Sequence, residues 1–147
     1  MNNLVRSALL LIHSQKHFRM STKISFQKDF TLGDDLNVRR MGYGAMRITG
    51  EGIWGPPKDH AGSIKVLQRA VELGVNFIDT ADSYGPNISE ELIAEALYPY
   101  PAGLVIATKG GFVRTGPGQW VINSSPKHLK QALEGSLARL KLDRIDL

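Results

Sequence analysis

The sequence predicts an α/β fold in which the strands of a parallel sheet alternate with helices. After residue 40, segments rich in strand-forming residues alternate with segments whose apolar residues recur at helical spacing. The run Gly103 to Thr108, "GLVIAT", is continuously apolar, which is typical of a strand buried on both faces. Residues 41–140 spend 100 residues on three strand–helix units, so eight units need about 270 residues, near the ~250 of a closed (β/α)8 barrel. We therefore expect the N-terminal part of a (β/α)8 TIM barrel, about three and a half βα units long, as an incomplete barrel.

A β-hairpin is expected before these units. Two strand-like segments flank the turn-forming cluster "LGDD" and predict a hairpin over residues 24–40. Residues 41–45 then form a short strand that ends in glycines. The Gly- and Pro-rich stretch "TGEGIWGPPKDH" follows as a loop.

The next units follow in strict alternation. Residues 59–73 carry apolar residues at helical spacing and stop at Gly74, and residues 75–79 form the second strand. Asn87 or Ser89 is the expected N-cap of the second helix. The continuous apolar run described above is the third strand.

A glycine-rich loop is expected to lead from the third strand to the third helix. Ser125 is a natural N-cap for that helix, and Pro126 suits its first position. The apolar stripe of this helix comprises Leu129, Ala132, Leu133, Ser136, Leu137 and Leu140. Residues 144–147, "RIDL", are expected to open a fourth strand.

Composition excludes several classes of function. The chain of 147 residues has no cysteine, so it has neither a disulfide framework nor a thiolate nucleophile or metal ligand. Its four histidines are scattered without ligand spacing, and no metal site is expected. The net charge of +4 comes from residues 1–28, which hold five basic residues and no acid. The remaining 13 basic and 14 acidic residues give −1, so no nucleic-acid partner is expected.

Residues 1–20 form a basic leader, expected to be disordered or an over-extended start with translation beginning at Met20. Its apolar run, residues 8–12, is far shorter than the ~20 residues of a membrane span. It lacks the small-residue cleavage site of a secretory signal. We expect a cytoplasmic protein with no membrane partner, and an organelle transit peptide is the alternative. The barrel part then covers residues 21–147, with its βα units in residues 41–147.

Charged residues close two neighbouring strands at the same end. Asp79 ends the second strand and Lys109 ends the third. Neighbouring parallel strands lie about 4.8 Å apart, so the two side chains can meet at the carboxyl face, where barrel active sites are built. Tyr84 follows Asp79 in the next loop and can fold back over the pair.

These three residue types suit one reaction. A tyrosine in water has a pKa near 10 and is a poor proton donor at neutral pH. A neighbouring lysine ammonium stabilises the phenolate, and an aspartate keeps that lysine charged and in place. The arrangement would make a general acid that protonates a carbonyl oxygen while hydride arrives at carbon.

Structural interpretations of the same residues stay open. Asp79 and Lys109 can simply be an ion pair at two strand ends, with Tyr84 an ordinary loop aromatic. Asp82 is expected to cap the loop backbone. Glu90 and Glu91 are expected to complement a helix dipole. Trp54 and Trp120 can either line a substrate pocket or simply pack against neighbouring residues.

Around these residues the chain resembles the aldo-keto reductases. The similarity runs through "GYGAMR", "GVNFIDTADSYG", "SEELIAEAL", "ATKGG" and "SLARLKLDRIDL". It implies that Tyr84, Lys109 and Asp79 match three members of the family's catalytic tetrad, with Tyr84 as the proton donor.

The resemblance also implies a cofactor and a substrate class. Gly44, Ala45 and Met46 match the loop that touches the nicotinamide end of the cofactor, and Asp79 belongs to the same site. The implied cofactor is NADPH, and the implied partner is a small-molecule carbonyl compound, an aldehyde or ketone. The stretches "EGIWGPPKDH" and "EALYPY" resemble the pyridoxal reductase branch, which implies pyridoxal as a substrate.

Parts of the family's machinery are not matched. In the family, the fourth catalytic residue is usually a histidine on the strand that "RIDL" begins. The pocket for the 2′-phosphate of the cofactor is built in the family from the last barrel strands. We therefore expect the chain alone to be a truncated, inactive fragment that self-associates through exposed sheet edges. Two hypotheses compete with a reductase fragment: a non-catalytic nucleotide-binding or regulatory module of the same fold, and an unrelated barrel enzyme in which Asp79 and Lys109 do different chemistry, such as Schiff-base formation.

Overall fold

The structure, a computed structural model, describes residues 28–147 and shows a mixed α/β chain. The expectations for the leader and for the first residues of the hairpin lie outside this range. The strands are β1 Asp29–Leu32, β2 Leu36–Arg39, β3 Tyr43–Gly44, β4 Phe77–Asp79, β5 Val105–Ala107, β6 Phe112–Gly116 and β7 Gln119–Ile122. The helices are the 3₁₀ turns η1 Ala45–Ile48 and η2 Glu51–Ile53, and α1 His60–Glu72, α2 Ile88–Leu97 and α3 Pro126–Leu140.

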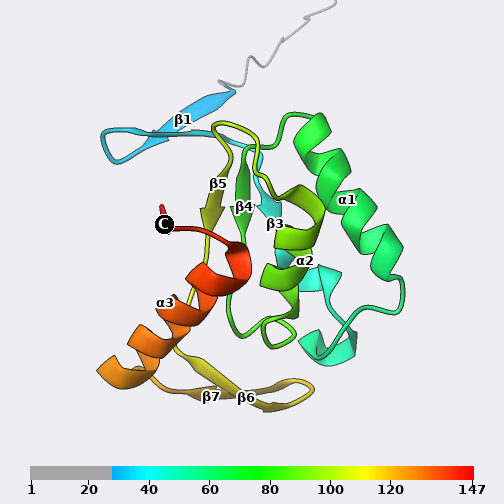
Figure 1. Cartoon of the computed structure of the whole chain (residues 1–147), viewed down its shortest axis with the longest axis vertical. Coiled ribbons are helices and arrows are strands. Elements are labelled where there is room, and N and C mark those ends of the chain that lie inside the picture. The colour runs from blue at the N-terminus through cyan, green and yellow to red at the C-terminus, as the bar shows by residue number, and fades with distance from the viewer. Residues whose placement is uncertain (1–27) are drawn as a thin grey trace, which may run out of the picture.

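A parallel sheet with the order β3–β4–β5 forms the centre of the molecule. Gly44 pairs with Asp79, and Asp79 in turn pairs with Ala107, so the carboxyl ends of the three strands are aligned. The strands run downward in Figure 1, towards η1, η2 and the β6–β7 hairpin, while α1, α2 and α3 follow one another beside the sheet. The predicted alternation of strands and helices is confirmed for this sheet.

Local capping signals explain where two of the helices begin. Asp59 caps α1, since its Oδ1 accepts a hydrogen bond from the Gly62 N–H at 2.8 Å. Ser125 caps α3 in the same way through the His128 N–H at 3.3 Å, with Pro126 at the first helical position. Asn87 precedes α2 without a side-chain cap.

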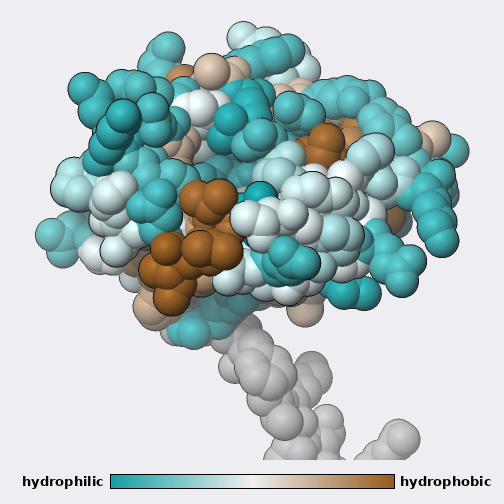
Figure 2. Space-filling model, turned by 90° about the horizontal axis from the view of Figure 1, so that it is seen from below, coloured by the Kyte–Doolittle hydropathy of each residue, from teal (hydrophilic) through white to brown (hydrophobic). Residues whose placement is uncertain are grey.

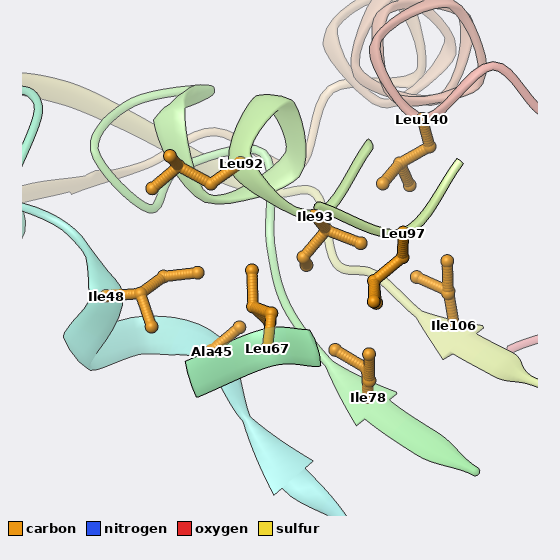
Figure 3. Close-up of a cluster of buried hydrophobic side chains, with 9 residues drawn as sticks. All are labelled: Ala45, Ile48, Leu67, Ile78, Leu92, Ile93, Leu97, Ile106 and Leu140. Atoms are coloured by element: carbon orange, nitrogen blue, oxygen red, sulfur yellow. The ribbon is translucent and has the colours of Figure 1, made fainter. Parts of the chain in front are cut away.

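The core lies between the sheet and its helices. All of β5 is buried, as the continuous apolar run predicts. Figure 3 shows side chains from η1, α1, β4, α2, β5 and α3 gathered in one cluster. Burying a Leu or Ile side chain contributes about 1.5–3 kcal/mol, so this cluster is a large part of what holds the layers together. Its members are Ala45, Ile48, Leu67, Ile78, Leu92, Ile93, Leu97, Ile106 and Leu140.

The segment after β5 is an antiparallel hairpin, where the sequence predicted only a glycine-rich loop. β6 and β7 pair from Phe112 opposite Ile122 to Gly116 opposite Gln119. Gly118 turns the chain with a φ of 67°, a conformation that glycine adopts without steric cost. The hairpin lies on the side that Figure 2 views, where the surface is mostly hydrophilic and carries a prominent brown apolar patch.

Three further expectations need correction. The first barrel strand is only the two residues of β3, because the chain turns into η1 at Ala45. Residues 144–147 form no regular strand, although the Thr108 N–H donates to the Leu147 carbonyl at 3.0 Å. Leu129 and Leu133 of the predicted α3 stripe are 41% and 49% exposed, since only the Ser136 and Leu140 side of that helix is buried.

Candidate active site

Asp79 and Lys109 meet at the carboxyl end of the sheet. Asp79 is the last residue of β4, and Lys109 follows β5 by two positions. The Lys109 Nζ donates to the Asp79 Oδ1 at 2.6 Å and to the Thr80 carbonyl at 2.6 Å. Both side chains of the pair are 48% exposed. The lysine is therefore fixed from two directions and yet accessible to a small molecule.

Tyr84 lies against this pair. The Lys109 Nζ is 5.4 Å from the centroid of the Tyr84 ring. The Tyr84 carbonyl accepts from the Ser89 N–H at 3.1 Å, which ties the loop to the first turn of α2. Gly85 has a φ of 103°, and a Cβ there would collide with Ile88, so the chain needs glycine directly after the tyrosine.

The loop after β3 supplies the residues expected at the cofactor. Gly44 and Met46 are exposed beside the carboxyl end of the sheet, and a Cβ built on Gly44 would meet open space. Ala45 is fully buried in the core, and its carbonyl accepts from the Ser89 hydroxyl at 3.1 Å. Gly44 and Met46 are therefore accessible to a ligand at the carboxyl end of the sheet. Ala45 anchors the loop to the core.

Two cavities border the site. A cavity of about 420 Å³ lies beside η1 and η2, lined by Met46, Arg47, Thr49, Gly50, Glu51, Gly52, Ile53 and Lys58. A smaller one of about 130 Å³ lies beside Lys109 and reaches α3 and Leu147. Tyr84 lines neither cavity. Its ring lies near the Lys109 Nζ and contacts Trp120 of the β6–β7 hairpin.

Glu90 forms a second ion pair, behind the first. It is fully buried, and its Oε2 accepts from the Arg139 Nε at 2.7 Å while its Oε1 accepts from the Thr108 hydroxyl at 2.6 Å. Glu90 lies in the first turn of α2, where an acid complements the helix dipole as expected, and the sequence did not predict its contacts with Arg139 and Thr108. Glu91, its neighbour, is exposed in the first turn of α2, as a dipole partner would be.

Asp82 is a buried carboxylate in the loop between β4 and Tyr84. Its N–H donates to the Lys109 carbonyl at 3.1 Å, and its carbonyl accepts from the Asn87 N–H at 2.7 Å. Burial raises the pKa of Asp82, with a further contribution from Glu90. The backbone of Asp82, rather than its side chain, makes the hydrogen bonds that shape the loop, and Oδ1 has no partner among residues 28–147.

Arg114 on β6 is a buried cation that the sequence patterns do not mark. Its guanidinium carbon lies 3.6 Å from the ring centroid of Trp120, and burial lowers the pKa of the guanidinium. The strand-forming residues on either side of "GPG", namely "FVRT" and "QWVI", are the signal that would have predicted its hairpin. All five of its N–H groups donate to backbone carbonyls, namely Gln119 (2.8 Å), Ile53 (2.9 Å), Ser83 (2.8 Å), Gly52 (3.0 Å) and Gly116 (3.4 Å).

Trp120, one of the two tryptophans noted in the sequence, packs directly on the site. Its ring lies edge-on to Tyr84, with centroids 6.4 Å apart and an angle of 85°. Trp54 pairs with Gly85 in an isolated bridge and has its ring 5.7 Å from the Arg114 guanidinium. Both tryptophans therefore border the loop of Tyr84.

Residues 28–147 contain neither a metal-binding cluster nor a membrane-spanning helix. No group of three or more His, Cys, Asp or Glu side chains in this range could hold a metal ion. None of the helices described is long and apolar enough to cross a membrane.

An accessible ion pair of lysine and aspartate thus lies beside a tyrosine at the carboxyl end of a parallel α/β sheet. The chain belongs to the aldo/keto reductase family, whose family model matches residues 40–147.

Relatives at the level of sequence are named as oxidoreductases. A Schizosaccharomyces pombe protein named an uncharacterized oxidoreductase is 58% identical over 113 residues, which are 77% of this chain and 37% of that protein. The pyridoxine 4-dehydrogenase of Escherichia coli is 47% identical over 118 residues, 80% of this chain and 41% of the relative. The chain thus spans about two fifths of the length of these relatives.

Solved structures share the fold. An aldo-keto reductase from Bacillus halodurans in its holo form is 30% identical with a TM-score of 0.68, over 81% of this chain and 38% of that one. The glycerol dehydrogenase of Gluconobacter oxydans is 31% identical, also with a TM-score of 0.68, over 81% of this chain and 37% of its own.

Proposed function

We propose that residues 41–147 carry the proton-donating part of an NADPH-dependent carbonyl reductase built on a (β/α)8 barrel. The observation that carries the proposal is the contact of Lys109 with Asp79 at 2.6 Å, directly beside the Tyr84 ring. Family membership and relatives named as oxidoreductases support it.

In the proposed reaction Tyr84 gives its hydroxyl proton to the carbonyl oxygen of the substrate. A bound nicotinamide would supply the hydride to the carbonyl carbon, so that an aldehyde or ketone becomes an alcohol. Lys109 stabilises the charge left on Tyr84, and Asp79 holds the Lys109 ammonium in place. Gly44 and Met46 present the exposed surface on which the nicotinamide end would rest.

Pyridoxal is the substrate that we propose first. The support is the 47% identity with a pyridoxine 4-dehydrogenase. A cavity of about 420 Å³ lies beside Met46, and its volume falls in the range of small-molecule sites.

A hybrid enzyme tests the proposal. The 118 matched residues of the E. coli pyridoxine 4-dehydrogenase would be replaced by the corresponding residues of this chain, and NADPH consumption measured with pyridoxal. We expect turnover by the hybrid and a loss of about 10²-fold or more in kcat in Tyr84→Phe, the usual scale of general acid catalysis. NADPH affinity should stay the same, because the phenyl ring is retained.

The 147-residue chain is assayed beside the hybrid, and Tyr98→Phe is the matched control. Tyr98 is an exposed tyrosine after α2 that lies outside the candidate site. Turnover of Tyr84→Phe at the level of the hybrid itself would contradict the assignment of the proton donor.

A further inference from the structure

We infer that Arg114 is a positioning residue for Tyr84, which it reaches by two separate routes, one through the backbone and one through Trp120. The inference rests on the proposed function, in which Tyr84 is the proton donor. It adds a residue of the β6–β7 hairpin to the requirements of the site.

The first route runs through the backbone on both sides of Tyr84. The Arg114 Nη1 donates to the Ser83 carbonyl at 2.8 Å and to the Ile53 carbonyl at 2.9 Å. The Ile53 carbonyl also accepts from the Gly85 N–H at 3.3 Å. Residue 83 is thereby hydrogen-bonded to the guanidinium directly and residue 85 through Ile53 of η2, which limits the positions that the intervening tyrosine can take.

The second route runs through an aromatic side chain. Arg114 and Trp120 are opposite each other across the β6–β7 ladder, and the guanidinium stacks on the indole at 3.6 Å. The same indole meets the Tyr84 ring edge-on, with the ring centroids 6.4 Å apart. Arg114 thus fixes the indole that packs against Tyr84.

The chemistry of the contacts requires arginine rather than another cation. A guanidinium has five N–H donors in a rigid fork, and here each of them meets a carbonyl, whereas a lysine ammonium has three. No carboxylate among residues 28–147 forms an ion pair with Arg114. A buried cation without a carboxylate is costly, so five carbonyl dipoles and the rings of Trp120 and Trp54 must take the place of a counter-ion.

Local hydrogen exchange in the full 147-residue chain tests the inference. The variants are Arg114→Met and Arg114→Lys, with Arg69→Met as the matched control, since Arg69 is an exposed arginine of α1. We expect exchange at the Tyr84 and Gly85 amides to accelerate at least about tenfold in both Arg114 variants, because local opening becomes easier. The amides of α1 should be unchanged, and the control should match the wild type throughout.

A kinetic measurement on the hybrid enzyme adds a readout that general loss of stability does not give. We expect kcat to fall about 10- to 100-fold in Arg114→Met, the scale of an ångström-sized misplacement, with the affinity for NADPH unchanged. Arg114→Lys should not restore kcat. Lysine keeps the positive charge but lacks the planar guanidinium with its five N–H donors.

Several outcomes would overturn the inference: unchanged exchange at residues 84 and 85, wild-type amides that are already unprotected there, an equal acceleration through α1, or full rescue by lysine. The proposed function is contradicted by a different result, which is full turnover of the hybrid enzyme carrying Tyr84→Phe. The exchange data decide the role of Arg114 at the loop in either case.

Discussion

Two ion pairs join neighbouring units of this chain, and they differ in exposure. The Lys109–Asp79 pair has both side chains 48% exposed, whereas the Arg139–Glu90 pair has side chains that are 21% and 0% exposed. Each has a contact of 2.6 or 2.7 Å and links segments far apart in sequence. Thr108, which hydrogen-bonds to Glu90, is the residue directly before Lys109.

The difference separates a pair that can react from a pair that holds the structure. An ion pair half open to solvent contributes little to stability, because water solvates both partners well. A carboxylate without solvent must keep its partner, because an unpaired buried charge costs several kcal/mol. We therefore interpret Arg139–Glu90 as the support on which the accessible Lys109–Asp79 pair rests.

Removing the cation from each pair should give the largest contrast. We expect Arg139→Met to lower the free energy of unfolding by about 3–5 kcal/mol, since it leaves Glu90 buried and unpaired. Lys109→Met should cost no more than about 1 kcal/mol, as for exposed pairs. Urea denaturation of the 147-residue chain measures both, and equal losses would remove the distinction between the pairs.

Activity should show the opposite order. In the hybrid enzyme, Asp79→Asn is expected to lower kcat by about 10²-fold, because Lys109 loses the charge that holds it in place. The free energy of unfolding should change by less than about 1 kcal/mol. Glu95→Gln, an exposed carboxylate of α2 paired with His60, is the matched control. Wild-type turnover in Asp79→Asn would leave the exposed pair without a catalytic role.

The smallest effect is expected from a neutral contact on the buried side. The Tyr100 hydroxyl donates to the Leu140 carbonyl at 2.7 Å, and Tyr100→Phe should cost about 1 kcal/mol. Burial, followed by Glu90 and Tyr98, raises the pKa of Tyr100 from 10.0 to about 12. The unfolded chain therefore releases this proton first as the pH rises.

The stability that Tyr100 contributes is thus complete below pH 10 and is lost as the pH rises through about 12. Denaturant titrations of the wild type and of Tyr100→Phe at pH 8 to 12 measure the difference between the two proteins. A constant difference over that range would show that the pKa of Tyr100 is not raised by folding.

Local sequence patterns determined much of the fold. The caps of α1 and α3 depend on contacts three residues apart, so Asp59 and Ser125 could be predicted from their neighbours alone. The continuous apolar run made β5 a buried strand. Asp79 and Lys109 could be placed together because the carboxyl ends of neighbouring parallel strands lie at the same edge of the sheet. The family resemblance likewise depended on short contiguous blocks.

Only the tertiary structure decided which charges are buried and what they contact. Glu90 meets Arg139 across 49 residues and Arg114 meets Ile53 across 61, and no periodicity records a partner at such a distance. Ala45 turned inward because η1 packs on the core. Burial and long-range hydrogen bonds arise when elements pack together. A local pattern could therefore place Tyr84 in its loop, whereas the side chains that hold that loop became visible only in the fold.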